Sequence, residues 1–148
     1  MATSQIAATL DTLRAALVDV TALAGVNIFS APVTLEESGT ECVEFGDPNL
    51  SEEVSAMGGS REETWKVGHC NVWVVVQPWH GSTETTIKAA RDRALAIFAA
   101  VETHINDTYT GSYPDVEITG GELLQRPGND GRGCYLGFTL TIKNQKNP

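Results

Sequence analysis

Apolar residues recur along residues 4–24 at alternating steps of four and three, which places them on one face of a helix. The members of this stripe are Ile6, Leu10, Leu13, Leu17, Val20 and Ala24. Thr3 or Ser4 can cap the start of the helix, and Gly25 can end it in the left-handed conformation. The opposite side carries charged residues, so we expect this helix to lie on the surface of a sheet.

Two short apolar stretches follow, and both predict strands. Residues 26–30 are β-branched and apolar, and residues 41–45 alternate so that Cys42 and Glu44 share one face. Residues 46–62 then combine glycine, proline and serine with four acidic residues. This composition predicts a long loop, which we expect to be mobile.

The strongest strand pattern covers residues 63–77. By period two, Trp65, Val67, Trp73 and Val75 share one face of this strand. Both faces are apolar toward its end, which predicts a central strand covered on two sides. A strand of this length would span about 50 Å if unbroken, so we expect a bulge or bend near Gly68.

A second amphipathic helix is predicted from residue 83 to about residue 105, with Ser82 or Thr83 as its N-cap. Its polar side carries Lys88, Arg91 and Asp92 on adjacent turns, the pattern of a solvated helix face with i, i+4 ion pairs. Residues 134–142 alternate strictly between apolar and polar. Because the turn-forming residues 127–133 precede them, we expect a hairpin there, centred on Asp130-Gly131.

Together these elements predict an α+β fold: a mixed, mainly antiparallel β-sheet with two long helices packed on it and a C-terminal β-hairpin. At 148 residues, the chain has the length of one domain, so we assign residues 1–148 to a single domain.

The net charge of −9 changes what this fold is expected to bind. Residues 1–74 hold 11 acidic and 3 basic residues, a net charge of −8, whereas residues 75–148 hold 8 and 7, a net charge of −1. No basic residue lies between Arg14 and Arg61. This balance argues against a protein that grips nucleic-acid phosphates, because such proteins gain affinity from basic side chains.

The remaining chemistry is sparse. The start of the sequence lacks the pattern of a secretory signal, and no apolar run is long enough to span a bilayer, so we expect a soluble protein without membrane contact. Three widely spaced cysteines are typical of reduced thiols in a cytosol. The histidines and cysteines lack zinc-site spacing, so we assign no metal, cofactor or catalytic residue.

Several short segments of the sequence resemble those of a known protein family. They are Leu23-Ala24-Gly25-Val26-Asn27-Ile28, Trp65-Lys66-Val67 running into Val72-Trp73-Val74-Val75-Val76, the helix 89–95, and the closing strand 134–142. In this order, after an N-terminal helix and around an acidic segment, they resemble the tail terminator proteins of long-tailed bacteriophages. The resemblance covers nearly the whole chain, but it is one of layout, because the family has no diagnostic short motif.

This resemblance implies a structural, non-enzymatic protein of the virion, assembled in the host cytoplasm. Family members form a hexameric ring on the head-proximal end of the tail tube, stop tube growth, and supply the docking surface for the head–tail connector proteins. The partners implied are therefore further copies of the chain, the tail tube protein and the connector. DNA passes through the ring without specific binding, and an acidic wall would repel its phosphates.

On this reading, the acidic stretch 36–53 lies on the lumen or on the docking face of the ring. The residues assigned to it are Glu36, Glu37, Glu52 and Glu53. Lys88, Arg91 and Arg93 of the next copy are expected to pair with this acidic region in a head-to-tail contact.

Three alternatives stay open at this stage. Another head–tail connector or neck protein of the virion would share the fold and differ in its ring partner. A small-molecule-binding α+β domain would place Trp65 or Trp73 around a pocket. A small hydrolase or isomerase would need His69 or His104 beside an acid.

Overall fold

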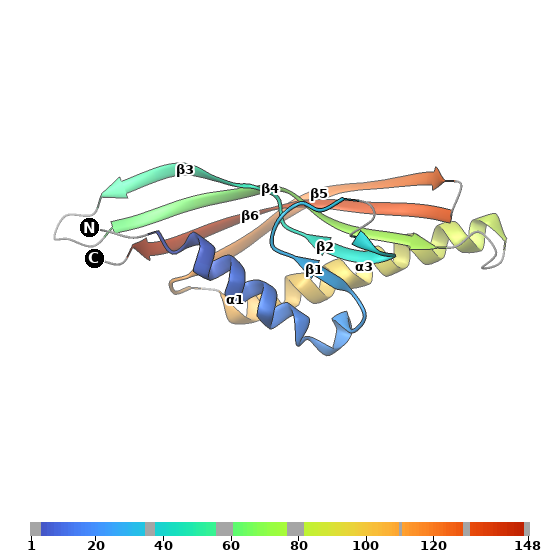
Figure 1. The fold of residues 1–148 in the computed structure, drawn as a ribbon, viewed down its shortest axis with the longest axis horizontal. Coiled ribbons are helices and arrows are strands. Elements are labelled where there is room, and N and C mark those ends of the chain that lie inside the picture. The colour runs from blue at the N-terminus through green and yellow to red at the C-terminus, as the bar shows by residue number, and fades with distance from the viewer. Residues whose placement is uncertain are drawn as a thin grey trace.

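The described residues of the chain fold into a six-stranded sheet that carries the helices α1 (Ile6–Val18) and α3 (Thr83–Thr108) on one of its faces (Figure 1). The computed structural model describes residues 4–34, 38–55, 61–76, 82–109, 111–128 and 131–146. The predicted fold class is confirmed: the architecture is α+β, with a mixed, mainly antiparallel sheet, two helices and a C-terminal hairpin.

Both helices form on the predicted apolar stripes, but the first is shorter than predicted: it ends at Val18, with Asp19 as its C-cap, so Gly25 does not end it. Helix α1 covers Ile6–Val18 and buries Leu10, Leu13 and Leu17, and a short 3-10 helix, η1 (Thr21–Leu23), follows it. Helix α3 covers Thr83–Thr108. The hydroxyl of Ser82 caps α3 by accepting a hydrogen bond from the backbone N–H of Thr85.

Six strands form the sheet. Their bounds are β1 Asn27–Phe29, β2 Glu41–Glu44, β3 Pro48–Ser55, β4 Arg61–Val76, β5 Asp115–Gly128 and β6 Gly131–Lys146. Their order is β1-β2-β4-β6-β5, with β3 also pairing with β4. Strands β1 and β2 are parallel, and the other pairs are antiparallel.

The loop predicted over residues 46–62 is wrong for residues 48–55, which form β3. Strand β2 pairs with residues 71–74 of β4, and β3 pairs with residues 61–67, so the two strands follow each other along one edge of β4. Pairing with the neighbouring strand β4 therefore outweighs a composition that favours turns. The prediction is also wrong for residues 61–62, which begin β4, and residues 56–60 lie outside the described residues.

The bulge predicted near Gly68 is confirmed. The register between β4 and β6 shifts between Val67 and Cys70, and His69 has a φ of 55°. Strand β5 has a second shift, between Thr119 and Gly121. Both irregularities lie at the same level of the sheet, because Cys70 and Gly121 pair with Phe138 from its two sides.

The predicted arrangement of side chains along β4, with Trp65, Val67, Trp73 and Val75 on one face, is wrong because the bulge inserts an extra residue. Val67 and Cys70 are three positions apart, yet both are fully buried, so the inward-facing positions change from odd to even across the bulge. Trp65 accordingly packs against the core, whereas Trp73 contacts Tyr135 on the other face. The two tryptophans therefore do not share a face.

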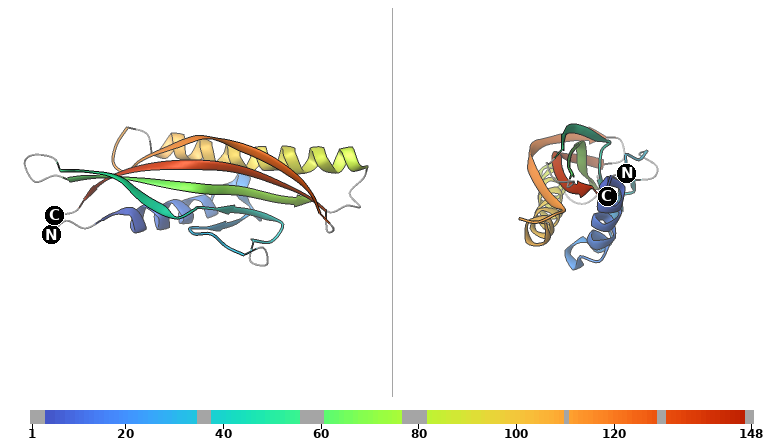
Figure 2. Two further views of the ribbon diagram at one scale, coloured as in Figure 1. Left: turned by 90° about the horizontal axis from the view of Figure 1, so that it is seen from above. Right: turned by 90° about the vertical axis from the view of Figure 1, so that its left-hand side faces the viewer.

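The core lies between the sheet and the two helices. It includes the α1 leucines, Ala94, Ile97, Val101 and Ile105 of α3, and alternate residues of β4 and β6. Both helices lie on the same side of the sheet, so the prediction that β4 is covered on both faces is wrong (Figures 1 and 2). In the described part of the chain, no helix is both long and apolar enough to cross a membrane.

Candidate functional site

The face of the sheet opposite α1 and α3, here called the bare face, is covered by no described helix (Figure 2). The two bulges divide it into two parts. The part formed by the first half of β4 carries polar and charged residues, among them Glu62, Thr64 and Lys66. The part formed by the second half of β4 carries aromatic and small residues.

An aromatic pair dominates this second part. The rings of Trp73 and Tyr135 lie 3.6 Å apart between centroids, with their planes inclined by 36°. The indole of Trp73 also covers Gly133, where an added Cβ would lie 2.7 Å from the ring carbon Cη2. Both aromatic residues belong to alternating segments of the sequence. Their pairing could not be predicted, because the bulge determines which face of β4 carries Trp73.

A hollow of about 600 Å³ opens beside this pair. Three glycines, Gly120, Gly121 and Gly137, line it together with the bulged residue His69. Glu122, Leu124 and Arg126 of β5 lie along the same hollow. Its rim therefore combines acidic, basic and apolar groups. This combination does not indicate one class of small ligand.

A second group of polar residues lies on the covered face, at the start of α1. The Glu63 side chain is fully buried, and its Oε1 accepts hydrogen bonds from the Gln5 backbone N–H at 2.6 Å and from the Ser4 hydroxyl at 3.1 Å. The Thr9 hydroxyl donates to Asn144 Oδ1 at 3.0 Å. A carboxylate at a helix N-terminus also complements the helix dipole, so this group fixes α1 to the sheet.

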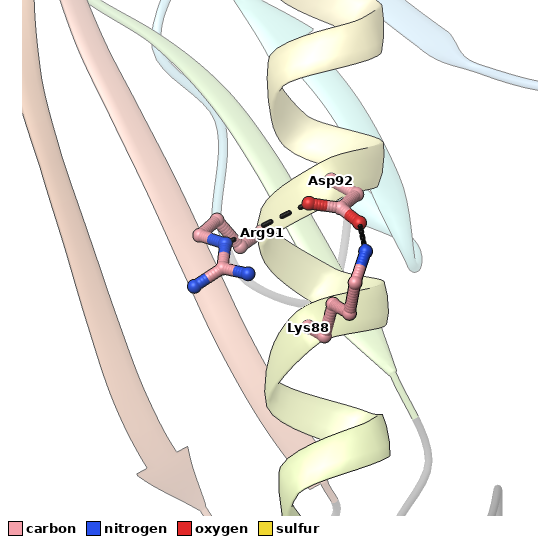
Figure 3. Close-up of polar contacts among 3 residues, drawn as sticks. All are labelled: Lys88, Arg91 and Asp92. Carbon is pink, nitrogen blue, oxygen red and sulfur yellow. Dashed lines mark hydrogen bonds and ion pairs between the residues drawn. The ribbon is translucent and has the colours of Figure 1, made fainter.

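The predicted basic residues divide between two environments. Lys88 and Arg91 both pair with Asp92 on the outer side of α3, and the Lys88 contact lowers the pKa of the Asp92 carboxyl (Figure 3). Arg93 instead holds Glu41 on β2 through two hydrogen bonds, of 2.6 and 3.1 Å, which raise the pKa of the guanidinium. Arg93 is therefore engaged within its own chain.

The predicted acidic residues are only partly described. Glu36 and Glu37 lie outside the described residues. Glu52 and Glu53 belong to β3, in register with Thr64 and Glu63 of β4. Strand β3 and the first turns of α3 lie toward opposite ends of the molecule (Figures 1 and 2). Among the described residues, Glu41 is the member of the acidic stretch 36–53 that meets a predicted basic residue, Arg93, within one chain, whereas Glu52 and Glu53 lie on a strand far from the first turns of α3.

The cysteines and histidines form no reactive pair in the described residues. Cys42, Cys70 and Cys134 are free and buried, and burial raises the pKa of the Cys42 and Cys70 thiols to about 11. No hydrogen bond joins His69 or His104 to a carboxylate of the described chain. Nor do the described side chains include a group of three or more His, Cys, Asp or Glu residues that could hold a metal ion.

No family model matches the sequence, and no curated protein matches it.

Proposed function

We propose that this chain is a ring-forming structural protein of a phage virion that caps the head-proximal end of the tail tube. In this role, a ring of six copies ends tube growth, offers a docking surface to the head–tail connector proteins, and lets DNA pass. The resemblance in layout motivates the proposal. The arrangement of free strand edges supports it.

The observation that carries the proposal is the direction of those edges. In the series β3, β4, β6, β5 every neighbouring pair is antiparallel, so β3 and β5 run in opposite directions. Strand β5 of one copy can therefore lie beside β3 of the next and continue the antiparallel pattern. A contact between two different edges is heterologous, and repetition of such a contact closes a ring when the rotation between copies allows it.

The separation of charge along the molecule also favours contacts between copies. The acidic β3 and the first turns of α3, which carry Lys88 and Arg91, lie toward opposite ends of the molecule (Figures 1 and 2), so a contact between them requires a neighbouring copy that is shifted along the strands. Lys88 and Arg91 share the single carboxylate of Asp92, so this cluster has one excess positive charge, which can pair with an acidic residue of a neighbouring copy. Arg93 is not assigned to this contact, because it already pairs with Glu41.

The net charge suits a channel for DNA. A charge of −9 per chain repels phosphates, so DNA can slide past such a wall without sticking to it. This repulsion acts over about 8 Å at physiological ionic strength, which is enough to matter inside a channel.

Native mass spectrometry combined with negative-stain imaging tests the proposal. The expected result is a six-fold ring in solution or upon addition of the tail tube protein. Arg91→Glu should reduce the ring population, whereas Lys143→Glu makes the same change of charge on β6 and should not. A strict monomer at high concentration, with and without the tube protein, would overturn the proposal. Binding of DNA with micromolar affinity at physiological salt would contradict the channel role.

A further inference from the structure

Strand β5 presents a free edge that is well defined at both ends. The register shift at Thr119/Gly121 interrupts it on one side, and Pro127, which has no backbone N–H, limits it on the other. Residues 121–126 between these limits are all exposed. An exposed, regular edge strand offers unpaired N–H and C=O groups to another strand.

Two adjacent leucines lie at the centre of this edge. Leu123 is 37% exposed and Leu124 is 38% exposed. Leu124 lines the hollow of the bare face, whereas Gln125, the next residue, lines a small hollow next to α3. Side chains alternate along a strand, so Leu123 lies on the same face as Gln125 and opposite to Leu124. The edge therefore has one leucine on each face at its midpoint. Such an edge favours association, because natural edge strands usually carry lysine or inward-pointing charges at their centre.

The charges around Leu124 are arranged symmetrically. Glu122 lies two residues before it and Arg126 two residues after it, and all three line the same hollow. In an antiparallel pair, residues at equal distances on either side of the centre lie opposite each other. A second copy of the same edge would thus place Arg126 opposite Glu122, twice, around a central pair of Leu124 residues. Opposite charges directly across two strands stabilise the pair.

We propose that two copies of the free chain associate through β5, antiparallel and related by a two-fold axis at Leu124. The dimer contact joins the two sheets edge to edge and covers the exposed leucines. This proposal does not rest on the ring function. If the ring also forms, the two assemblies compete for β5. A chain in the dimer cannot pair its β5 with β3 of another copy, so it cannot enter the ring.

Cysteine cross-linking tests the register. Leu124→Cys places two thiols directly opposite each other, so mild oxidation should give a covalent dimer in high yield. Gln125→Cys is the matched control: its thiol would lie opposite Leu123 of the other copy, and two such thiols would be too far apart to bridge. The native cysteines are at most 1% exposed, so they should not contribute. Equal cross-linking of both variants, or of neither, would overturn the proposed register.

Sedimentation equilibrium tests the charge pattern. Glu122→Arg alone and Arg126→Glu alone should each weaken dimerisation about tenfold or more, because each places two like-charged pairs in the contact. The double variant Glu122→Arg with Arg126→Glu should restore the wild-type dimer. A wild-type chain that stays monomeric, or a double variant no tighter than the single ones, would contradict the proposal. Six-fold rings without a Leu124→Cys cross-link would leave the ring proposal standing and remove this one.

Discussion

Glu63 on β4 and Asn144 on β6 lie directly opposite each other at the start of α1, and both are almost completely buried. Each keeps one polar atom, Glu63 Oε2 and Asn144 Nδ2, without a hydrogen-bond partner. The remaining polar atom of each side chain is an acceptor: Glu63 Oε1 accepts from Ser4 and Gln5, which precede α1, and Asn144 Oδ1 accepts from Thr9 of α1. Two neighbouring strands thus use polar side chains to hold the same end of one helix.

Glu63→Ala should lower the free energy of unfolding by about 1–3 kcal/mol, because it removes the acceptor of the Gln5 N–H in a buried place. The control is Glu62→Ala, the neighbouring, partly exposed residue that accepts a hydrogen bond from the Tyr113 hydroxyl. It should change stability by less than about 0.5 kcal/mol. Chemical denaturation measures both, and equal losses would contradict the role assigned to Glu63.

Gly133→Ala should destabilise the fold by about 1–3 kcal/mol, because the new methyl group meets the Trp73 ring at 2.7 Å. The ring must then leave its place beside Tyr135, which should alter the near-ultraviolet circular dichroism. Gly120→Ala is a useful comparison, since an added Cβ there meets nothing within 4 Å. A Gly133→Ala variant as stable as Gly120→Ala would show that Trp73 does not lie over residue 133.

The buried thiols predict a loss of stability at high pH. Burial raises the pKa of Cys42 and Cys70 from 9.0 to about 11, so between these values the unfolded chain releases protons that the folded chain retains. Stability should therefore fall as the pH rises from 9 to 11, and at pH 10 the loss for each thiol is about 1.4 kcal/mol relative to a pH well below 9. Thermal unfolding of the wild type and of Cys70→Ser across this range measures the effect. The variant should show a shallower dependence on pH.

Arg93→Ala should lower stability by roughly 0.5–1 kcal/mol, because it removes a partly exposed, two-point contact with Glu41. Arg91→Ala should change the stability of the single chain by much less, since Arg91 contributes only a 3.6 Å contact within an exposed cluster. If Arg91→Ala proves the more destabilising of the two in urea denaturation, the division between a structural and a free arginine is wrong.

The sequence predicted both helices, the central strand and the C-terminal strand because each has a clear period of apolar residues. The bulge in β4 could be anticipated from the length of the strand and from Gly68. Its effect on Trp65 and Trp73 required knowing that one extra residue is inserted. Strand β3 could not be predicted, because its acidic, proline-containing segment is stabilised by pairing with β4 and lacks an apolar period of its own.

The candidate site was harder to predict than the fold. The basic residues 88, 91 and 93 follow one another closely in the sequence, yet only the structure separates Arg93, which contacts a strand that is 52 positions away. The free edge of β5 was also missed. A strand becomes an edge only through the order of the whole sheet, which local patterns do not contain.

Strand β6 is the one long strand of the described sheet to which neither bulge adds a residue, and it therefore sets a length for the molecule. Its 16 residues extend over roughly 50 Å at about 3.3 Å per residue. If copies stand side by side in the proposed ring with strands tilted by 35–45°, the layer they form is roughly 40 Å high. Lengthening or shortening the β5–β6 hairpin by whole pairs of residues would change the height of this layer without changing which side chains lie on each face of the sheet.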